Sequence, residues 1–505
     1  SRGDRARADR PARAAARGRL VKRAPEWRQS DLPQPPPYTF RNVVRIIGPG
    51  AILLGLSLGS GDWILGPAAT ARWGPGILWI CTVSVLLQAL LNTEMARYTL
   101  ATGESIFAGF MRVAPGPRVW GPVYALLHLG QVGWPGWALA AASTLTAAFL
   151  GRMPRAEDQA VIVGLGYAIF LGAVAVTLLG ARARRTVEWA EWLVMAWTLG
   201  FLAVLGLLLV PWSIWQAVAV GFVWPSLPAE RDVSFDWVLL AAFAAYSGGG
   251  GTINAALTHW LRDKGFGMAG TIESRPVVVG GESVRFARDG MTFAPTEANL
   301  GKWRQWWRYL RTDFWYLWTA GCLAGMAFPA LLAAHFATRG EIWTGVGAPA
   351  WLAQAVGWRY GFVVWTLVLL TGFAILALTQ VGIVEGFARS VTDILWTARA
   401  RSRAPGAEGP AGGLYYAVLV VFTVAGCAAM TLADPFRLIL IGANVAALNF
   451  VVLSLHTVWI NRALLPPELR PSLWRELGVL VCGAFFAALL AKVLRDPARL
   501  SGLLS

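Results

Sequence analysis

Two stretches of the sequence decide the fold. Residues 46–66 read IIGPGAILLGLSLGSGDWILG, and residues 237–260 read WVLLAAFAAYSGGGGTINAALTHW. Each stretch is apolar at both ends and is interrupted in its middle by glycine and polar residues. Glycine costs about 1 kcal/mol relative to alanine inside a helix, so the glycine run at 248–251 disfavours a continuous helix. We therefore predict two helices, each broken near its middle.

The composition places these helices in a membrane. Of the 505 residues, 56% are hydrophobic and 14% are charged, and the mean hydropathy is +0.52. Ordinary soluble domains carry about 25% charged residues. So little charge excludes a soluble enzyme, a disordered protein and a plain nucleic-acid binder, because it cannot cover a soluble surface of this size. We expect membrane lipid, and no nucleic acid, around this chain.

Eleven apolar runs are long enough to cross a bilayer, which takes about 20 apolar residues. We predict an all-α integral membrane protein with eleven transmembrane helices, in a bacterial plasma membrane. With the N-terminus in the cytoplasm and the C-terminus outside, most of the 44 Lys and Arg residues fall in cytoplasmic segments, as the positive-inside rule requires. The predicted spans are 46–72, 75–98, 119–150, 160–180, 187–210, 236–260, 314–337, 359–387, 414–432, 435–460 and 474–494.

Two polar segments accompany the membrane-spanning domain of residues 46–495. Residues 1–45 are rich in Arg and Pro and predict a disordered basic cytoplasmic tail. Residues 262–312 predict a cytoplasmic loop. Its basic and aromatic stretch 302–308 favours an amphipathic helix lying in the membrane interface.

The two breaks lie at matching depth. Gly59 lies 13 residues into the first run and Gly248 lies 12 residues into the sixth. At 1.5 Å per residue, both breaks fall about 20 Å along a helix that crosses a core of roughly 30 Å. In the predicted topology these two helices run in opposite directions. Such paired breaks are typical of secondary transporters built from inverted repeats, here about 46–210 and 236–460, with an extra helix at 474–494.

Broken helices favour a binding site. Unwinding frees N–H and C=O groups that lipid cannot satisfy, so the break must be buried or must line a wet cavity, where its carbonyls can bind a cation. The alternative is that the glycines only let helices pack closely. Asp62 is the first candidate, because an acid at this depth is costly unless it binds a cation or a proton.

The pattern resembles the Nramp family, the natural resistance-associated macrophage proteins that transport divalent metals. That family belongs to the amino acid-polyamine-organocation superfamily with the LeuT fold. The resemblance implies a LeuT-type 5+5 inverted repeat with broken helices 1 and 6. The motifs that carry it are Gly48-Pro49-Gly50, Leu86-Leu87-Gln88, Thr102-Gly103 and Glu385-Gly386-Phe387.

The site departs from the family pattern. Where the family carries Asp-Pro-Gly-Asn in helix 1, this chain has Gly59-Ser60-Gly61-Asp62. Where the family carries Met-Pro-His-Asn in helix 6, it has Gly251-Thr252-Ile253-Asn254. Neither Met nor Cys lies at the breaks, so the oxygens there favour a hard ion such as Mg²⁺ over Mn²⁺ or Fe²⁺.

Three functions remain open. The first is a secondary active transporter that moves a divalent cation by alternating access, driven by an H⁺ or Na⁺ gradient. The second is a symporter of an amino acid or another small organic substrate, because Gly-Ser-Gly is similar to the break of amino-acid transporters in the superfamily. The third is a sensor or scaffold. The chain carries no enzyme motif such as GxSxG, HExxH or a Walker loop, and needs no cofactor.

The candidate residues follow from these patterns. Asp62 and Asn254 are the predicted metal ligands. His128, Glu94 and Arg97 are candidates for a proton relay or gate, with a structural ion pair or hydrogen bond as the alternative. The predicted substrate- or ion-binding set is Gly59, Ser60, Gly61, Asp62, Tyr246, Gly248, Gly251, Thr252, Asn254 and Asn444.

Overall fold

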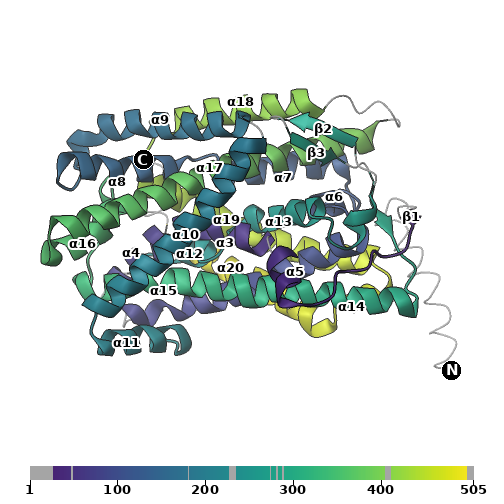
Figure 1. Ribbon diagram of the computed structural model, residues 1–505, viewed down its shortest axis with the longest axis horizontal. Helices are drawn as coiled ribbons and strands as arrows, with labels where there is room; N and C mark the ends of the chain where they lie inside the picture. The colour runs from purple at the N-terminus through teal and green to yellow at the C-terminus, as the bar shows by residue number, and fades with distance from the viewer. Residues whose placement is uncertain are drawn as a thin grey trace.

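The protein is a bundle of helices that run mostly along its longest axis (Figure 1). The computed structural model describes residues 27–46, 49–179, 181–226, 235–272, 275–279, 282–286, 289–403 and 411–496. The α-helices are α2 (Phe40–Ile46), α3 (Pro49–Ser57), α4 (Gly66–Trp73), α5 (Trp79–Thr102), α6 (Ile106–Phe110), α7 (Pro117–Val132), α8 (Gly136–Leu150), α9 (Gln159–Leu178), α10 (Ala181–Leu209), α11 (Trp212–Val223), α12 (Trp237–Tyr246), α13 (Gly251–Asp263), α14 (Glu297–Arg311), α15 (Thr319–Phe336), α16 (Trp351–Tyr360), α17 (Phe362–Ser402), α18 (Ala411–Ala429), α19 (Pro435–Leu464) and α20 (Leu473–Leu494).

Shorter elements join or interrupt these helices. Two are π-helices, η1 (Leu58–Leu65) and η5 (Thr312–Trp318). The 3-10 helices are η2 (Pro75–Ile77), η3 (Ala156–Asp158), η4 (Gly267–Thr271), η6 (Ala348–Ala350) and η7 (Pro467–Leu469). The strands are β1 (Arg28–Gln29), β2 (Arg275–Val279), β3 (Glu282–Phe286) and β4 (Met291–Thr292).

Among the described residues, eight helices are long and apolar enough to cross a membrane. They coincide with the predicted spans 2, 4, 5, 7, 8, 9, 10 and 11. The other three predicted spans are the ones divided into shorter helices: α3, η1 and α4 for the first, α7 and α8 for the third, and α12 and α13 for the sixth. The division of the third span at 133–135 was not predicted, although Gly133 and Pro135 mark it in the sequence.

The prediction of an unwound first span is wrong. Residues 58–65 remain helical, and their hydrogen bonds widen into the π pattern of η1. A π-helix keeps the backbone bonded within the helix while it adds a residue to a turn, so it avoids exposing N–H and C=O groups to lipid. The sixth span is broken as predicted, at residues 247–250 between α12 and α13.

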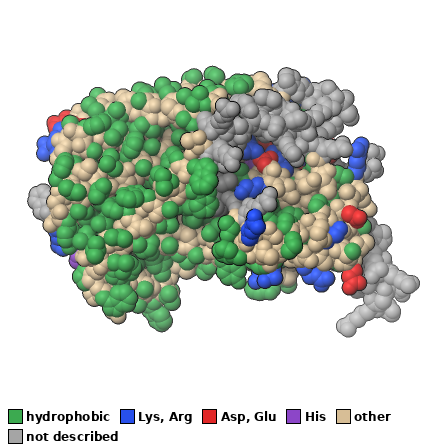
Figure 2. Space-filling view, in the orientation of Figure 1, with side chains coloured by type: hydrophobic (Ala, Val, Ile, Leu, Met, Phe, Trp, Pro, Cys, Tyr) green, Lys and Arg blue, Asp and Glu red, His purple; other side chains and the backbone are tan. Residues whose placement is uncertain are grey.

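The two ends of the bundle differ, and we name them by what they carry. The strap end, on the right in Figure 1, carries α14, α6 and the four strands. The cavity end carries α11 and α16. Hydrophobic side chains cover most of the visible face between them, and charged side chains gather toward the strap end (Figure 2). A continuous apolar exterior suits a surface that faces lipid rather than water.

The prediction of a disordered tail is wrong for residues 27–45. Residues 27–38, which we call the strap, lie across α14. The indole of Trp306 donates to the Pro33 carbonyl at 2.9 Å, Tyr309 donates to the Pro37 carbonyl at 3.0 Å, and β1 pairs in parallel with β4. Pro-rich chain favours extended structure, which lets it cover a helix without a helix of its own. Residues 1–26 lie outside the described residues.

The predicted loop 262–312 is also more ordered than expected. β2 and β3 form an antiparallel hairpin, and α14 continues through η5 into α15 as one helix of 40 residues. The buried face of α14 contacts protein, because Trp306 lies against Phe266 and Trp303 against Phe293. This face of α14 is therefore buried against the strap and the loop, and the predicted interfacial position of the helix stays a prediction.

Candidate functional site

Asp62 lies in η1, in the middle of the first span. Its side chain is 1% exposed, and neither carboxylate oxygen has a hydrogen-bond partner among the described residues. It faces α15, where an added methyl group at Gly325 would lie 2.5 Å from Oδ2. A buried carboxylate without a partner is costly, and π-helices are frequent at functional sites. No hydrogen bond among the described residues therefore offsets the cost of burying the Asp62 carboxylate.

Two thiols lie near this carboxylate. Cys81 of α5 and Cys322 of α15 are both fully buried, and both interact electrostatically with Asp62. Cys81 also contacts Ser247, the first residue of the break in the sixth span. The expectation that no Cys lies at the breaks is thus corrected, because α5 and α15 bring thiols there from elsewhere in the sequence. The described residues nevertheless hold no group of three or more His, Cys, Asp or Glu close enough to bind a metal.

The break in the sixth span is held by one side chain from α7, that of Gln131. Its amide nitrogen donates to the Gly250 carbonyl at 2.8 Å. Its amide oxygen accepts from the Thr252 backbone N–H and hydroxyl at 2.9 Å each, and from Asn449 of α19 at 2.8 Å. Gly250 and Gly251 have φ angles of 90° and 42°, which favour glycine. The Gly250 carbonyl and the Thr252 N–H are therefore satisfied by a neutral amide.

A second amide pair continues this network toward α5. The Asn254 amide nitrogen donates to Gln88 at 3.1 Å and to Asn92 at 3.0 Å. Gln88 in turn donates to the Ser84 hydroxyl at 3.0 Å. None of the contacts described for Asn254 involves Asp62, so the two predicted metal ligands have separate partners in this structure.

The two interrupted spans meet directly. Gly61 of η1 lies against the end of α12, where an added methyl group would overlap the Tyr246 carbonyl oxygen. Gly59, on another side of η1, has the same relation to Thr379 of α17. In the sixth span, Gly248 lies against Gln88 and Trp318. The glycines thus serve close packing and the site together, which the sequence analysis treated as alternatives.

Of the remaining candidates, Asn444 and His128 have partners other than Asp62. Asn444 donates to the Val238 and Leu440 carbonyls, at 3.1 and 2.9 Å, and links α19 to α12. His128 is buried beside Phe387 and lines a small hollow with Ile253 and Gly386. Ser60 belongs to η1.

Glu94 and Arg97 form an ion pair at the strap end. The Arg97 Nε lies 2.6 Å from a Glu94 carboxylate oxygen, and Arg475 of α20 pairs with the same carboxylate. Trp307 of α14 stacks with both guanidinium groups, at 4.2 and 5.2 Å. The pair therefore ties α5 to α14 and α20, which fits a gate or a structural clamp.

A cavity of about 540 Å³ opens at the cavity end. Its wall includes Arg72, Asp236, Glu341, Asp434 and Arg437, and apolar residues of α12 and α19 complete it. Arg72 pairs with Asp236 at 2.9 Å, and Arg437 with Asp434 at 3.3 Å. The cavity therefore offers both signs of charge beside an apolar wall.

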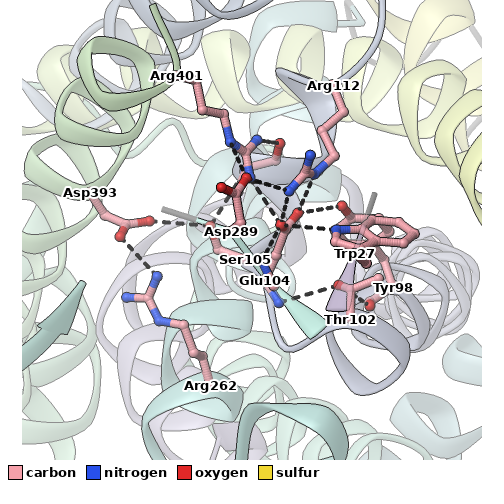
Figure 3. A network of polar contacts seen from close by, with 12 residues as sticks. Trp27, Tyr98, Thr102, Glu104, Ser105, Arg112, Arg262, Asp289, Asp393 and Arg401 are labelled. Atoms are coloured by element: carbon pink, nitrogen blue, oxygen red, sulfur yellow. Dashed lines mark hydrogen bonds and ion pairs between the residues drawn. The ribbon is translucent and has the colours of Figure 1, made fainter. Parts of the chain in front are cut away.

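The strap end is closed by a network of ion pairs (Figure 3). Glu104 follows α5 and pairs with Arg112 and, at 3.0 Å, with Arg401 of α17; it also accepts from Tyr98 at 2.6 Å and from the Trp27 indole of the strap at 3.3 Å. Burial raises the pKa of the Glu104 carboxyl, but the two guanidinium groups outweigh it and hold that pKa well below its usual range. A neighbouring pair joins Asp393 of α17 to Arg262 of α13 at 2.8 Å.

Comparison with solved structures identifies the fold. Two structures of Eremococcus coleocola manganese transporter mutants match with TM-scores of 0.58 and 0.59, each at 13% identity over 92% of this chain and 89% of the other. A third, of the same transporter with an aromatic bis-isothiourea substituted compound, matches with a TM-score of 0.52 at 15% identity, over 92% of this chain and 88% of that one. The chain has the fold of these manganese transporters.

This likeness confirms the resemblance seen in the sequence at the level of the fold, and the chain is an integral membrane protein. No family model matches it, and no curated protein matches it in sequence.

The amides around the break were not among the predicted site residues. Gln88 appeared only in a family motif, and Gln131 and Asn92 were not predicted. Each is a polar residue inside an apolar run, which is the signal that could have singled it out. Their partners lie 119 to 318 residues away in the sequence, so spacing alone did not reveal the network.

Proposed function

We propose that this chain is a secondary active transporter that moves a divalent metal cation by alternating access, with Asp62 as the charged ligand. The observation that carries the proposal is the buried Asp62 carboxylate, whose two oxygens have no partner among the described residues. A cation would supply the missing compensation, because a charge removed from water is stable only when paired or bound to a metal. The fold, shared with manganese transporters, supports the same function.

The neighbouring thiols refine the choice of ion. Cys81 and Cys322 lie near Asp62, and sulfur ligands suit borderline transition metals better than they suit Mg²⁺. We therefore favour Mn²⁺ or Fe²⁺ over the hard ion that the sequence suggested. Binding would require the thiols to approach the carboxylate, which a rearrangement of η1 against α15 during transport could bring about.

The orientation follows from the two ends. In our proposal the strap end faces the cytoplasm and is closed by the Glu104 network, while the cavity end faces outward and is open. This agrees with the predicted cytoplasmic N-terminus, with eleven spans and with a 5+5 repeat. Alternating access would then require the ion pairs of the strap end to separate once substrate is bound.

A second candidate is a symporter of a small organic substrate. The cavity supports it, because a volume of about 540 Å³ lies in the range of roughly 300–1,000 Å³ typical of sites for organic ligands. Arg72 and Arg437 pair with acids on the same wall, and either could exchange that partner for the carboxylate of a substrate.

Uptake into proteoliposomes tests both candidates. Wild-type protein should accumulate Mn²⁺, Asp62→Asn should not, and Asp158→Asn, in the loop between α8 and α9, should behave as wild type. Equal uptake by wild type and Asp62→Asn would remove Asp62 from the mechanism. A melting-temperature screen with Mn²⁺, Mg²⁺ and amino acids separates the substrate classes, because a ligand raises the melting temperature only if it binds the folded protein.

A further inference from the structure

The first and seventh spans contact each other in a reciprocal way. Each contains one π-helix, η1 in the first and η5 in the seventh. η1 packs against α15 of the seventh span, and η5 packs against α3 of the first. Each π-helix also holds one buried acid that faces a glycine of the other span: Asp62 faces Gly325, and Asp313 faces Gly50. The interface therefore carries a second carboxylate, which the proposed function does not use.

Asp313 holds the beginning of the first span. Its side chain is fully buried, and one carboxylate oxygen accepts from the Gly50 backbone N–H at 2.9 Å. Gly50 is the second residue of α3, so this hydrogen bond ties the first span directly to η5 of the seventh.

The other oxygen of Asp313 has a different status. Oδ1 is buried and has no hydrogen-bond partner among the described residues, and a methyl group added at Gly50 would lie 2.7 Å from it. A helix cap needs one acceptor oxygen, and a neutral amide would supply it. A buried carboxylate with one oxygen that has no hydrogen bond costs more free energy than a neutral amide in the same place. This cost indicates a further role for Asp313.

The charges around Asp313 are few. Lys264, after α13, acts on it electrostatically. Of the elements packed against η5, α3 has no charged residue and α15 has only His335, at its far end. α5 contributes Glu94 and Arg97, which pair with each other. α14 contributes Glu297, Lys302, Arg304, Arg308 and Arg311, of which Arg308 lies over the Tyr38 ring.

We propose that Asp313 is a second proton-binding carboxylate of the transport cycle, and that its charge state decides whether the strap-end half of the first span stays docked on the seventh. When ionised, it holds the Gly50 N–H by a charge-assisted hydrogen bond, which is roughly twice as strong as a neutral one. When protonated, it loses that strength, so α3 can move away. The inference rests on the proposed transporter function, but concerns a site about 18 Å from Asp62 along the helix.

The test measures opening of the interface without any substrate. Leu54 of α3 is 4% exposed and lies against Gly321, so a cysteine placed there reacts only when the two spans separate. Full-length Leu54→Cys protein would be labelled with a water-soluble maleimide, with and without Asp313→Asn, and labelling of the parent chain would be subtracted. Rates are compared at equal pH, so the titration of the thiol cancels.

We expect Asp313→Asn to raise labelling at least threefold at pH 8 and to leave it unchanged at pH 5, where the proposal requires wild type to be protonated already. If Asp313→Asn is labelled at the same rate as wild type at pH 8 and at pH 5, Asp313 is only a cap. If Asp313→Asn is labelled faster than wild type to the same extent at both pH values, the charge of Asp313 is not the switch. Either result overturns the proposal. Asp158→Asn should have no effect at either pH.

A second variant covers the case in which Asp313→Asn folds poorly. Gly50→Ala displaces the carboxylate by its methyl group and leaves the charge in place, so it should raise labelling at pH 8 as well. If the labelling rate of Gly50→Ala at pH 8 is not raised, the proposal that Asp313 holds α3 on the seventh span is contradicted. Because labelling does not depend on transport, loss of Mn²⁺ uptake in the test of the proposed function leaves this result unaffected.

Discussion

The interruptions of the first and sixth spans look alike in sequence but solve opposite problems. At the break in the sixth span, the neutral amide of Gln131 satisfies the Gly250 carbonyl and the Thr252 N–H. The first span keeps its backbone bonded through a π-helix, yet it buries the Asp62 carboxylate without a hydrogen-bond partner among the described residues. A satisfied neutral network stabilises one conformation, whereas an unsatisfied charge is stabilised by binding an ion. We therefore propose a structural role for the break in the sixth span and an ion-binding role for Asp62 in the first.

The largest effect should come from Asp62→Asn. A contact to a charged ligand is worth about 1.5–3 kcal/mol, so its loss should weaken cation binding by roughly 10- to 100-fold. The melting temperature should stay equal or rise, because the variant removes an uncompensated buried charge. Cation titration and thermal unfolding of the same preparation measure the two effects. A fall in melting temperature would show that Asp62 stabilises the fold, and the contrast between the first and the sixth span would then not hold.

Gln131→Leu should act in the opposite sense. It leaves the Gly250 carbonyl, the Thr252 N–H and the Asn449 amide without their partner, at about 1–3 kcal/mol for each buried group. We expect the melting temperature to fall by about 5 °C or more. Gln131→Glu, which keeps the acceptor oxygen, should recover part of the loss at low pH. If unfolding is unchanged in Gln131→Leu, the amide does not hold the break.

Gly61→Ala tests the direct contact between the two spans. Its methyl group would overlap the Tyr246 carbonyl, and overpacking of this kind costs about 1–3 kcal/mol. Gly55→Ala is the matched control in the same span, because nothing lies within 4 Å of its added methyl group. We expect the control to be neutral or more stable by up to about 1 kcal/mol. Equal melting temperatures for the two variants would show that the spans do not meet at Gly61.

Glu104→Gln should have an effect confined to the strap end. The native pKa of Glu104 lies below its usual range, so its charge stabilises the folded state above the unfolded pKa of about 4.3, and this stability is lost as the pH falls toward the native pKa. The difference in melting temperature between wild type and Glu104→Gln should therefore be constant near neutrality and shrink below about pH 4. A difference that grows on acidification would contradict the network.

The sequence by itself determined the membrane class, because apolar runs of this length are stable only in lipid and their charges mark the ends. It also determined the break of the sixth span, because a run of glycines has no helical alternative. Tertiary structure alone decided that the first span stays helical, because Gly59 and Gly61 are held there by contacts with α17 and α12.

Tertiary structure alone also decided which polar groups meet. Gln131, Thr252 and Asn449 lie far apart in the chain, and the thiols near Asp62 come from α5 and α15. Local pattern fixes where a helix forms, but the partners of a buried side chain depend on which helices pack together, and no spacing within one helix records that.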